Sequence, residues 1–141
     1  MMLAMADHVV ADLPAASPVL ELAHPIAGFP DARAFELVPV EEGSALAHFR
    51  AVDNPAAQFL VVPASVLFPA YAPEVDDESA ALLGLDADTD VLVLLIVHAA
   101  ETLADTTVNL RAPLLVNVGA RRVAQVILDD VSLPLAAPLP A

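Results

Sequence analysis

The stretch from residue 106 to residue 117, TTVNLRAPLLVN, decides how the rest of the chain is interpreted. It is β-branched and aliphatic, as strands are, yet Asn109, Arg111 and Pro113 lie inside it, and strand interiors are depleted in Asn and Pro. In a continuous strand these three would share one face, and Val108, Leu110, Ala112 and Leu114 would share the other. The first face is too polar for a core. It is either a solvated sheet face or a surface for a partner.

Working outward from this stretch, further strand-like segments recur at spacings near ten residues, with turn residues between them. We expect strands at 19–24, 35–40, 45–52, 58–62, 91–97 and 122–129. A helix is predicted only at 76–83, where Asp76, Asp77 and Glu78 favour a helix N-terminus and Gly84 favours a stop. The pattern predicts a mainly β fold, a small antiparallel β-barrel-like or sandwich domain with one short α-helix.

The 141 residues suit one domain with a core of its own. Residues 1–18, rich in Ala and Pro, are predicted to be a flexible N-terminal extension. Residues 19–130 carry the strand pattern, and residues 131–141 (VSLPLAAPLPA) form a Pro-rich tail that we expect to end the fold in an extended arm.

The charge is strongly acidic, because five arginines and no lysine face nineteen carboxylates, for a formal net charge of −14. Such a chain repels phosphate backbones, so we expect no direct contact with nucleic acid. The acidity favours a basic protein partner through electrostatic steering, or it reflects solubility or salt adaptation. The most apolar uncharged run, residues 91–100, is about half the ~20 residues of a membrane-spanning helix, so no membrane insertion is expected.

Catalytic motifs are missing from the sequence. There is no cysteine, and no serine lies in a GxSxG motif. Asp86, Asp88 and Asp90 resemble the start of a calcium loop, but Val91 and Val97 occupy the positions that need Gly and Glu. We therefore assign no catalytic, cofactor-binding or metal-binding residue, and expect neither a cofactor nor enzymatic activity.

The segment from residue 67 to residue 74, LFPAYAPE, combines aromatic rings, rigid prolines and a carboxylate. Such a segment suits a protein interface, or it is a loop that anchors its rings in the core. The residues that we predict to contact a partner are Phe68, Pro69, Tyr71, Glu74, Asn109, Asn117 and Gln125. For Asn109 and Asn117 the alternative is that they satisfy neighbouring backbone groups at bulges.

Five stretches in order resemble the flagellar assembly factor FliW family over about residues 19–130. They are GFPDARAFEL (28–37), NPAAQFLVVPASVLFPAYAPEV (54–75), DVLVLLIVH (90–98), TVNLRAPLLVN (107–117) and QVILDD (125–130). The resemblance implies a cytoplasmic β-barrel-like protein that is not an enzyme and that we expect to be a monomer when free. Its implied partners are flagellin and the RNA-binding translational repressor CsrA, which the family antagonises allosterically and thereby controls flagellin translation.

Two other interpretations remain open from the residues. One is a small-ligand-binding or enzymatic β-barrel that uses the barrel mouth. The other is a structural oligomer in which the strand at 106–117 pairs edge to edge with a second copy.

Overall fold

The computed structural model describes residues 2–4, 19–23, 32–41, 44–54, 56–86 and 89–139. Over these residues the fold is mainly β, as predicted, with two short α-helices and one 3₁₀ turn. The elements are β1 (Met2–Ala4), β2 (Val19–Leu22), β3 (Ala34–Pro39), β4 (Ala47–Ala51), β5 (Gln58–Pro63), α1 (Ala64–Leu67), β6 (Glu74–Asp76), α2 (Asp77–Leu83), β7 (Val91–His98), η2 (Leu103–Asp105), β8 (Thr107–Val108), β9 (Leu114–Asn117), β10 (Arg122–Gln125) and β11 (Ala137–Pro138).

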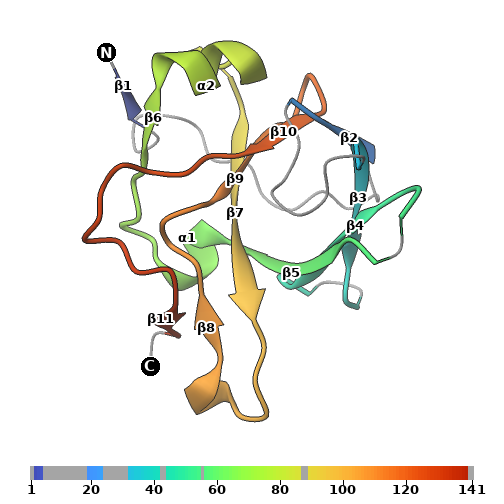
Figure 1. Cartoon of the computed structure of the whole chain (residues 1–141), viewed down its shortest axis with the longest axis vertical. Helices are drawn as coiled ribbons and strands as arrows, with labels where there is room; N and C mark the ends of the chain where they lie inside the picture. Colours follow the sequence, from blue (N-terminus) through green and yellow to red (C-terminus); the bar gives the residue numbers. More distant parts are fainter. Residues whose placement is uncertain are drawn as a thin grey trace.

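Seven of these strands close into a barrel in the order β7-β5-β4-β3-β2-β10-β9, and the β7–β9 pairing completes the ring (Figure 1). Within this ring β2 and β10 run parallel, and the other pairs are antiparallel. Strand β8 pairs with the C-terminal end of β7, and β11 pairs with β8, so the sheet extends beyond the barrel at this end. The predicted fold class is therefore confirmed.

Strand β7 is the wall between two hydrophobic cores. Successive side chains of a strand point to opposite faces, so Leu92 and Leu94 enter the barrel interior while Val91 and Val93 pack on the outside. Both faces are covered, which is why the strand reads as the uninterrupted apolar run VLVLLIV rather than as an alternation.

The barrel interior is filled by side chains. Phe35 and Phe49 are fully buried there and stack with their ring centroids 4.4 Å apart and their planes 9° from parallel. Phe59 packs at a tilt against Phe35, at a centroid distance of 6.4 Å. Leucine and valine side chains from the other barrel strands complete this first core.

The second core lies between the outer face of β7, β9 and β10 and the elements that cover it, which include α1, β6, α2 and the C-terminal segment. The predicted helix is confirmed as α2. Asp76 caps it by accepting a hydrogen bond from the Ser79 N–H (3.2 Å), and Gly84 ends it in the left-handed region at φ 70°. The single-turn helix α1 was not predicted, since four residues are too few to show a helical period.

The prediction of one continuous strand at 106–117 is wrong. Two short strands, β8 and β9, pair with opposite ends of β7, and the chain bends away from β7 between them. The Asn109 side chain holds this bend, because its Oδ1 accepts the N–H groups of Arg111 (2.9 Å) and Ala112 (3.0 Å). The two predicted faces are therefore not formed, and Pro113 and Leu115 of the polar face are buried, as Val108 is.

The C-terminal segment lies against the barrel. The guanidinium of Arg111 donates to the carbonyl oxygens of Leu133 (2.9 Å) and Val131 (2.8 Å), and the Leu110 N–H donates to Pro134 O (3.0 Å). Strand β11 then pairs with β8. At the other end, β1 pairs antiparallel with β6, while most of the predicted extension 1–18 lies outside the described residues. The division of the chain at residues 18 and 130 stays a prediction.

Candidate functional site

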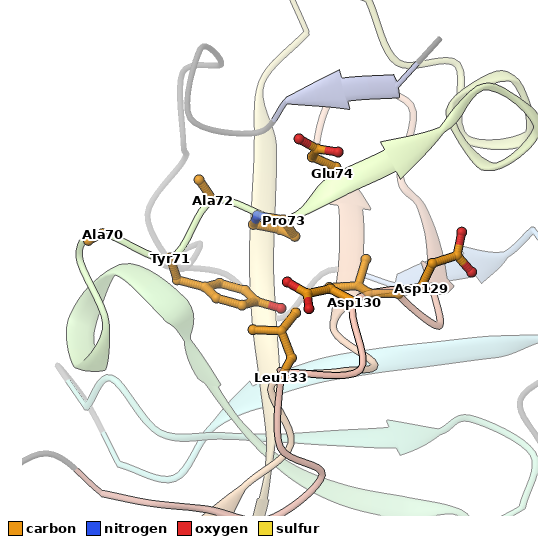
Figure 2. Close-up of a pocket in the computed structure, with 9 residues that line it drawn as sticks. Ala70, Tyr71, Ala72, Pro73, Glu74, Asp129, Asp130 and Leu133 are labelled. Carbon is orange, nitrogen blue, oxygen red and sulfur yellow. The ribbon is translucent and has the colours of Figure 1, made fainter.

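A groove of about 520 Å³ lies between the aromatic segment and the chain that follows β10 (Figure 2). One wall is the loop from α1 into β6, and the other is the segment leading into the C-terminal tail. The lining residues are Ala70, Tyr71, Ala72, Pro73, Glu74, Leu128, Asp129, Asp130 and Leu133. Three carboxylates and no arginine are among them, so the groove combines an aromatic ring with a strongly negative potential.

The Tyr71 side chain is held in place in this groove. Its hydroxyl donates a 2.6 Å hydrogen bond to the carbonyl oxygen of Leu110, in the bend between β8 and β9. The ring is half-buried, and this burial raises the pKa of the phenol well above its ordinary value of 10.0. Phe68 is also half-buried against the second core. The aromatic segment therefore anchors its rings in the core and also presents one of them to the groove.

The carboxylates differ in how they are held. The Ser132 hydroxyl and N–H donate to Asp130 Oδ1 at 2.6 and 3.0 Å, and these bonds lower the pKa of Asp130, with a smaller contribution from the charge of Arg111. In Figure 2 the Asp130 carboxylate points toward the Tyr71 ring, whereas the Asp129 carboxylate points away from this ring. Glu74 is exposed. The lowered pKa keeps Asp130 ionised at neutral pH, which suits the groove to a cationic ligand.

The structure brings together two of the predicted contact residues, Tyr71 and Glu74, in this groove. Pro69 is exposed in the same loop, next to the half-buried Phe68. Gln125 lies at the end of β10, with its Nε2 3.4 Å from Ala112 O. None of these positions has been tested for partner contact, so the assignments stay predictions.

Asn117 is buried and its amide is used inside the chain. Its Nδ2 donates to Leu83 O at 2.7 Å, with Gly84 O at 3.4 Å, and its Oδ1 accepts the Ala120 N–H at 3.2 Å. It therefore joins the C-terminus of α2 to the turn after β9. Together with the contacts of Asn109, this geometry matches the structural alternative, in which both asparagines satisfy backbone groups.

Sequence reasoning missed the second wall of the groove. Asp129 and Asp130 lie at the end of the strand predicted at 122–129, and Leu133 lies in the predicted Pro-rich tail, so neither was grouped with Tyr71. The available signal was the run LDD directly after QVI, but nothing local to it indicates that Tyr71 lies opposite.

The alternatives left open by the sequence can now be compared with the structure. Among the described residues, the side chains of the first core occupy the barrel interior, where the small-ligand interpretation needs an open mouth. Both β8 and β9 already have a neighbour on each side, so the 106–117 segment has no free edge for pairing with a second copy. Within the described ranges, no cluster of three or more His, Asp or Glu is placed to hold a metal ion, and no helix has the length and apolarity needed to cross a membrane.

Comparison with known proteins agrees with this architecture. A protein-family model described as FliW protein matches residues 12–139. The chain belongs to the FliW family. The match covers the barrel together with the C-terminal segment held by Arg111, and it extends beyond the residues 19–130 over which the resemblance was predicted.

Individual FliW relatives are similar over most of their length. Proteins named flagellar assembly factor FliW are 35% identical over 107 residues in Geobacillus sp. (strain WCH70) and 34% identical over 107 residues in Bacillus subtilis (strain 168). These matches cover 76% of this chain and 74% and 75% of the relatives. A crystal structure of the flagellar assembly factor FliW superimposes with a TM-score of 0.78 at 28% identity, covering 87% of this chain and 86% of that chain.

Proposed function

We propose that this FliW-family protein acts by binding other proteins, with flagellin and the repressor CsrA as its two partners, and that it is a cytoplasmic regulator of flagellin translation rather than an enzyme. The observation that supports this most directly is the acidic groove beside Tyr71, because it offers an aromatic contact next to the carboxylates of Glu74 and Asp130. The partners themselves are those implied by the family to which the chain belongs.

The physical basis of the proposal is charge complementarity. A chain with a formal net charge of −14 steers basic proteins toward it and repels nucleic acid. An RNA-binding repressor carries basic charge around its RNA site, so an acidic groove can bind beside that site and antagonise the repressor allosterically. Antagonism then needs no contact between this protein and the RNA.

The proposal is tested by isothermal titration calorimetry with purified flagellin monomer and purified CsrA from the same host. We expect binding to at least one of them, weakened by the double variant Glu74→Gln, Asp130→Asn. Asn at position 130 keeps an oxygen that can accept the Ser132 hydrogen bonds, so the variant removes charge and preserves the turn.

The matched control is Glu41→Gln, Asp53→Asn, which removes two exposed carboxylates that do not line the groove. If this control weakens binding as much as the groove variant does, net charge and not the groove is responsible. If wild-type protein binds neither partner at micromolar concentration, the proposed function is wrong.

A further inference from the structure

A second groove, of about 440 Å³, shares no lining residue with the acidic groove. It lies where α1 faces the loop from β7 to β8. Its lining is predominantly apolar and consists of Ala45, Leu46, Leu60, Val62, Val66, Leu67, Val97, Ala99, Ala100, Glu101, Thr102, Leu103, Thr106 and Leu139.

Three large apolar side chains of this groove are left open to solvent. Leu103 is 79% exposed, Val66 is 54% exposed and Leu46 is 38% exposed. They come from three different parts of the fold, namely η2, α1 and the segment before β4. A single exposed apolar residue needs no explanation, but three around one apolar hollow are typical of a protein-binding surface.

The floor of the groove excludes recognition by strand addition. Leu60 of β5 already pairs with His48 of β4 and with Val97 of β7, and Val97 also pairs with Val108 of β8. With these edges occupied, a partner meets side chains and not free backbone groups. Pro-rich segments dock in aromatic-lined grooves, whereas this lining is aliphatic, and an aliphatic groove suits the apolar stripe of an amphipathic helix.

The charges around the groove favour a positively charged partner. Glu101 lines it and Asp105 lies in η2 beside Leu103, both exposed. All five arginines fall within the described residues, and none of them lines this groove. A second copy of the chain would bring another −14 of charge against these carboxylates, which disfavours self-association.

We propose that this groove is a docking site for an amphipathic helix of a partner protein. The apolar stripe of the helix packs on Val66, Leu67 and Leu103, and lysines or arginines along its flanks face Glu101 and Asp105. The inference does not rest on the proposed function, because it concerns a different surface and its test uses neither flagellin nor CsrA.

The test is fluorescence anisotropy with a labelled Leu/Ala/Lys peptide of about 18 residues, or five helical turns, with leucines at i, i+3, i+4 and i+7. We expect saturable binding, and we expect Leu103→Asp and Val66→Asp each to weaken it by about tenfold or more, because a charge replaces an apolar contact. Val131→Asp is the matched control, since Val131 is 81% exposed and lies outside this groove. Circular dichroism of each variant checks that the fold is retained.

Two further peptides make the result specific. A scrambled peptide of the same composition tests the apolar stripe, and an analogue with Glu in place of Lys tests the charge. Equal binding of either peptide would overturn the proposal, as would a Leu103→Asp variant that binds like the wild type. A concentration-dependent dimer in sedimentation equilibrium that Leu103→Asp dissociates would assign the groove to a second copy and also overturn it.

Discussion

Asn117 is, with Thr106, one of two polar residues that are buried among the described residues. Both polar atoms of its side-chain amide form hydrogen bonds, because Nδ2 donates to the end of α2 and Oδ1 accepts from the turn after β9. Asn109 performs a similar task in the bend after β8. The polar residues of the TTVNLRAPLLVN stretch therefore satisfy backbone groups where the chain leaves regular pairing, as buried polar groups must.

Replacement of Asn117 by Ala is expected to lower the free energy of unfolding by about 2 kcal/mol, because it leaves a buried carbonyl of α2 without its donor. Urea denaturation measures the change. Gln125→Ala is the control, since its single 3.4 Å contact predicts a loss below about 1 kcal/mol. Equal losses for the two variants would contradict the bridging role of Asn117.

Among the described non-glycine residues, Arg121 is the one with a positive φ, at 56°. This left-handed conformation costs a residue with a Cβ about 1 kcal/mol, which glycine avoids. We therefore expect Arg121→Gly to be more stable than Arg121→Ala by about 1 kcal/mol in thermal unfolding. At Ala120, which has no such φ, glycine should lower stability instead. A more stable Ala variant at position 121 would contradict the assignment of strain.

Among the elements, the bend between β8 and β9 links the acidic groove to the C-terminal segment. It provides the carbonyl that Tyr71 binds and the guanidinium that holds Val131 and Leu133. Strand β11 follows and pairs with β8. Because the strand is interrupted in its middle, backbone groups such as those of Leu110, which a continuous strand would use for ladder pairing, bind other segments instead.

A chain that ends at residue 130 is expected to lose about 2 kcal/mol or more of unfolding free energy, because hydrogen bonds to the charged Arg111 group and the burial of Ala137 are lost. A chain that ends at residue 139 is the control and should unfold like the full chain. The midpoint of urea denaturation compares the three. If the shorter chain matches the full chain, the segment after residue 130 does not stabilise the barrel.

In the whole molecule, the two cores share the wall formed by β7 and β9. Removal of either core would expose apolar side chains that now line the other face of the same strands. We therefore expect the barrel and the elements packed outside it to unfold in one cooperative transition. Tyr71 is well placed to report it, because it is the chain's only tyrosine and there is no tryptophan.

The pH dependence of this transition follows from Tyr71. Burial raises its pKa in the folded state above 10.0, so the unfolded chain loses the phenol proton first. The contribution of Tyr71 to stability is complete below pH 10.0 and falls as the pH rises above it. Since lysine and cysteine are absent, few other groups titrate in this range. Tyrosinate absorbance should therefore appear together with unfolding, and Tyr71→Phe should flatten the alkaline loss of stability.

Tyrosinate absorbance that rises near pH 10.0 while the far-ultraviolet circular dichroism stays native would contradict this assignment. It would mean that the phenol titrates in the folded state and that its bond to Leu110 O opens freely. An unchanged alkaline slope in Tyr71→Phe would show that other groups cause the loss of stability.

Local chemistry was enough to predict several elements. The Asp76 cap and the Gly84 stop identified α2, and the β-branched runs between turn residues identified the mainly β class. The TTVNLRAPLLVN stretch predicted the family, yet its conformation was predicted wrongly. Its side chains are those of a strand, but the Asx turn at Asn109 offers backbone hydrogen bonds that compete with strand pairing. A period-2 pattern of apolar residues does not contain this competition.

Composition and local pattern alone establish the acidity of this chain, its mainly β class and α2. Closure of the barrel needed pairing between β7 and β9 and between β2 and β10, which depends on contacts distant in sequence. The same is true of both grooves, because the walls of each come from segments that are far apart in the sequence. Tyr71 and Asp130 become one surface only because the bend at Leu110 brings their segments together. Local propensities act over a few residues, whereas a binding surface is made by packing.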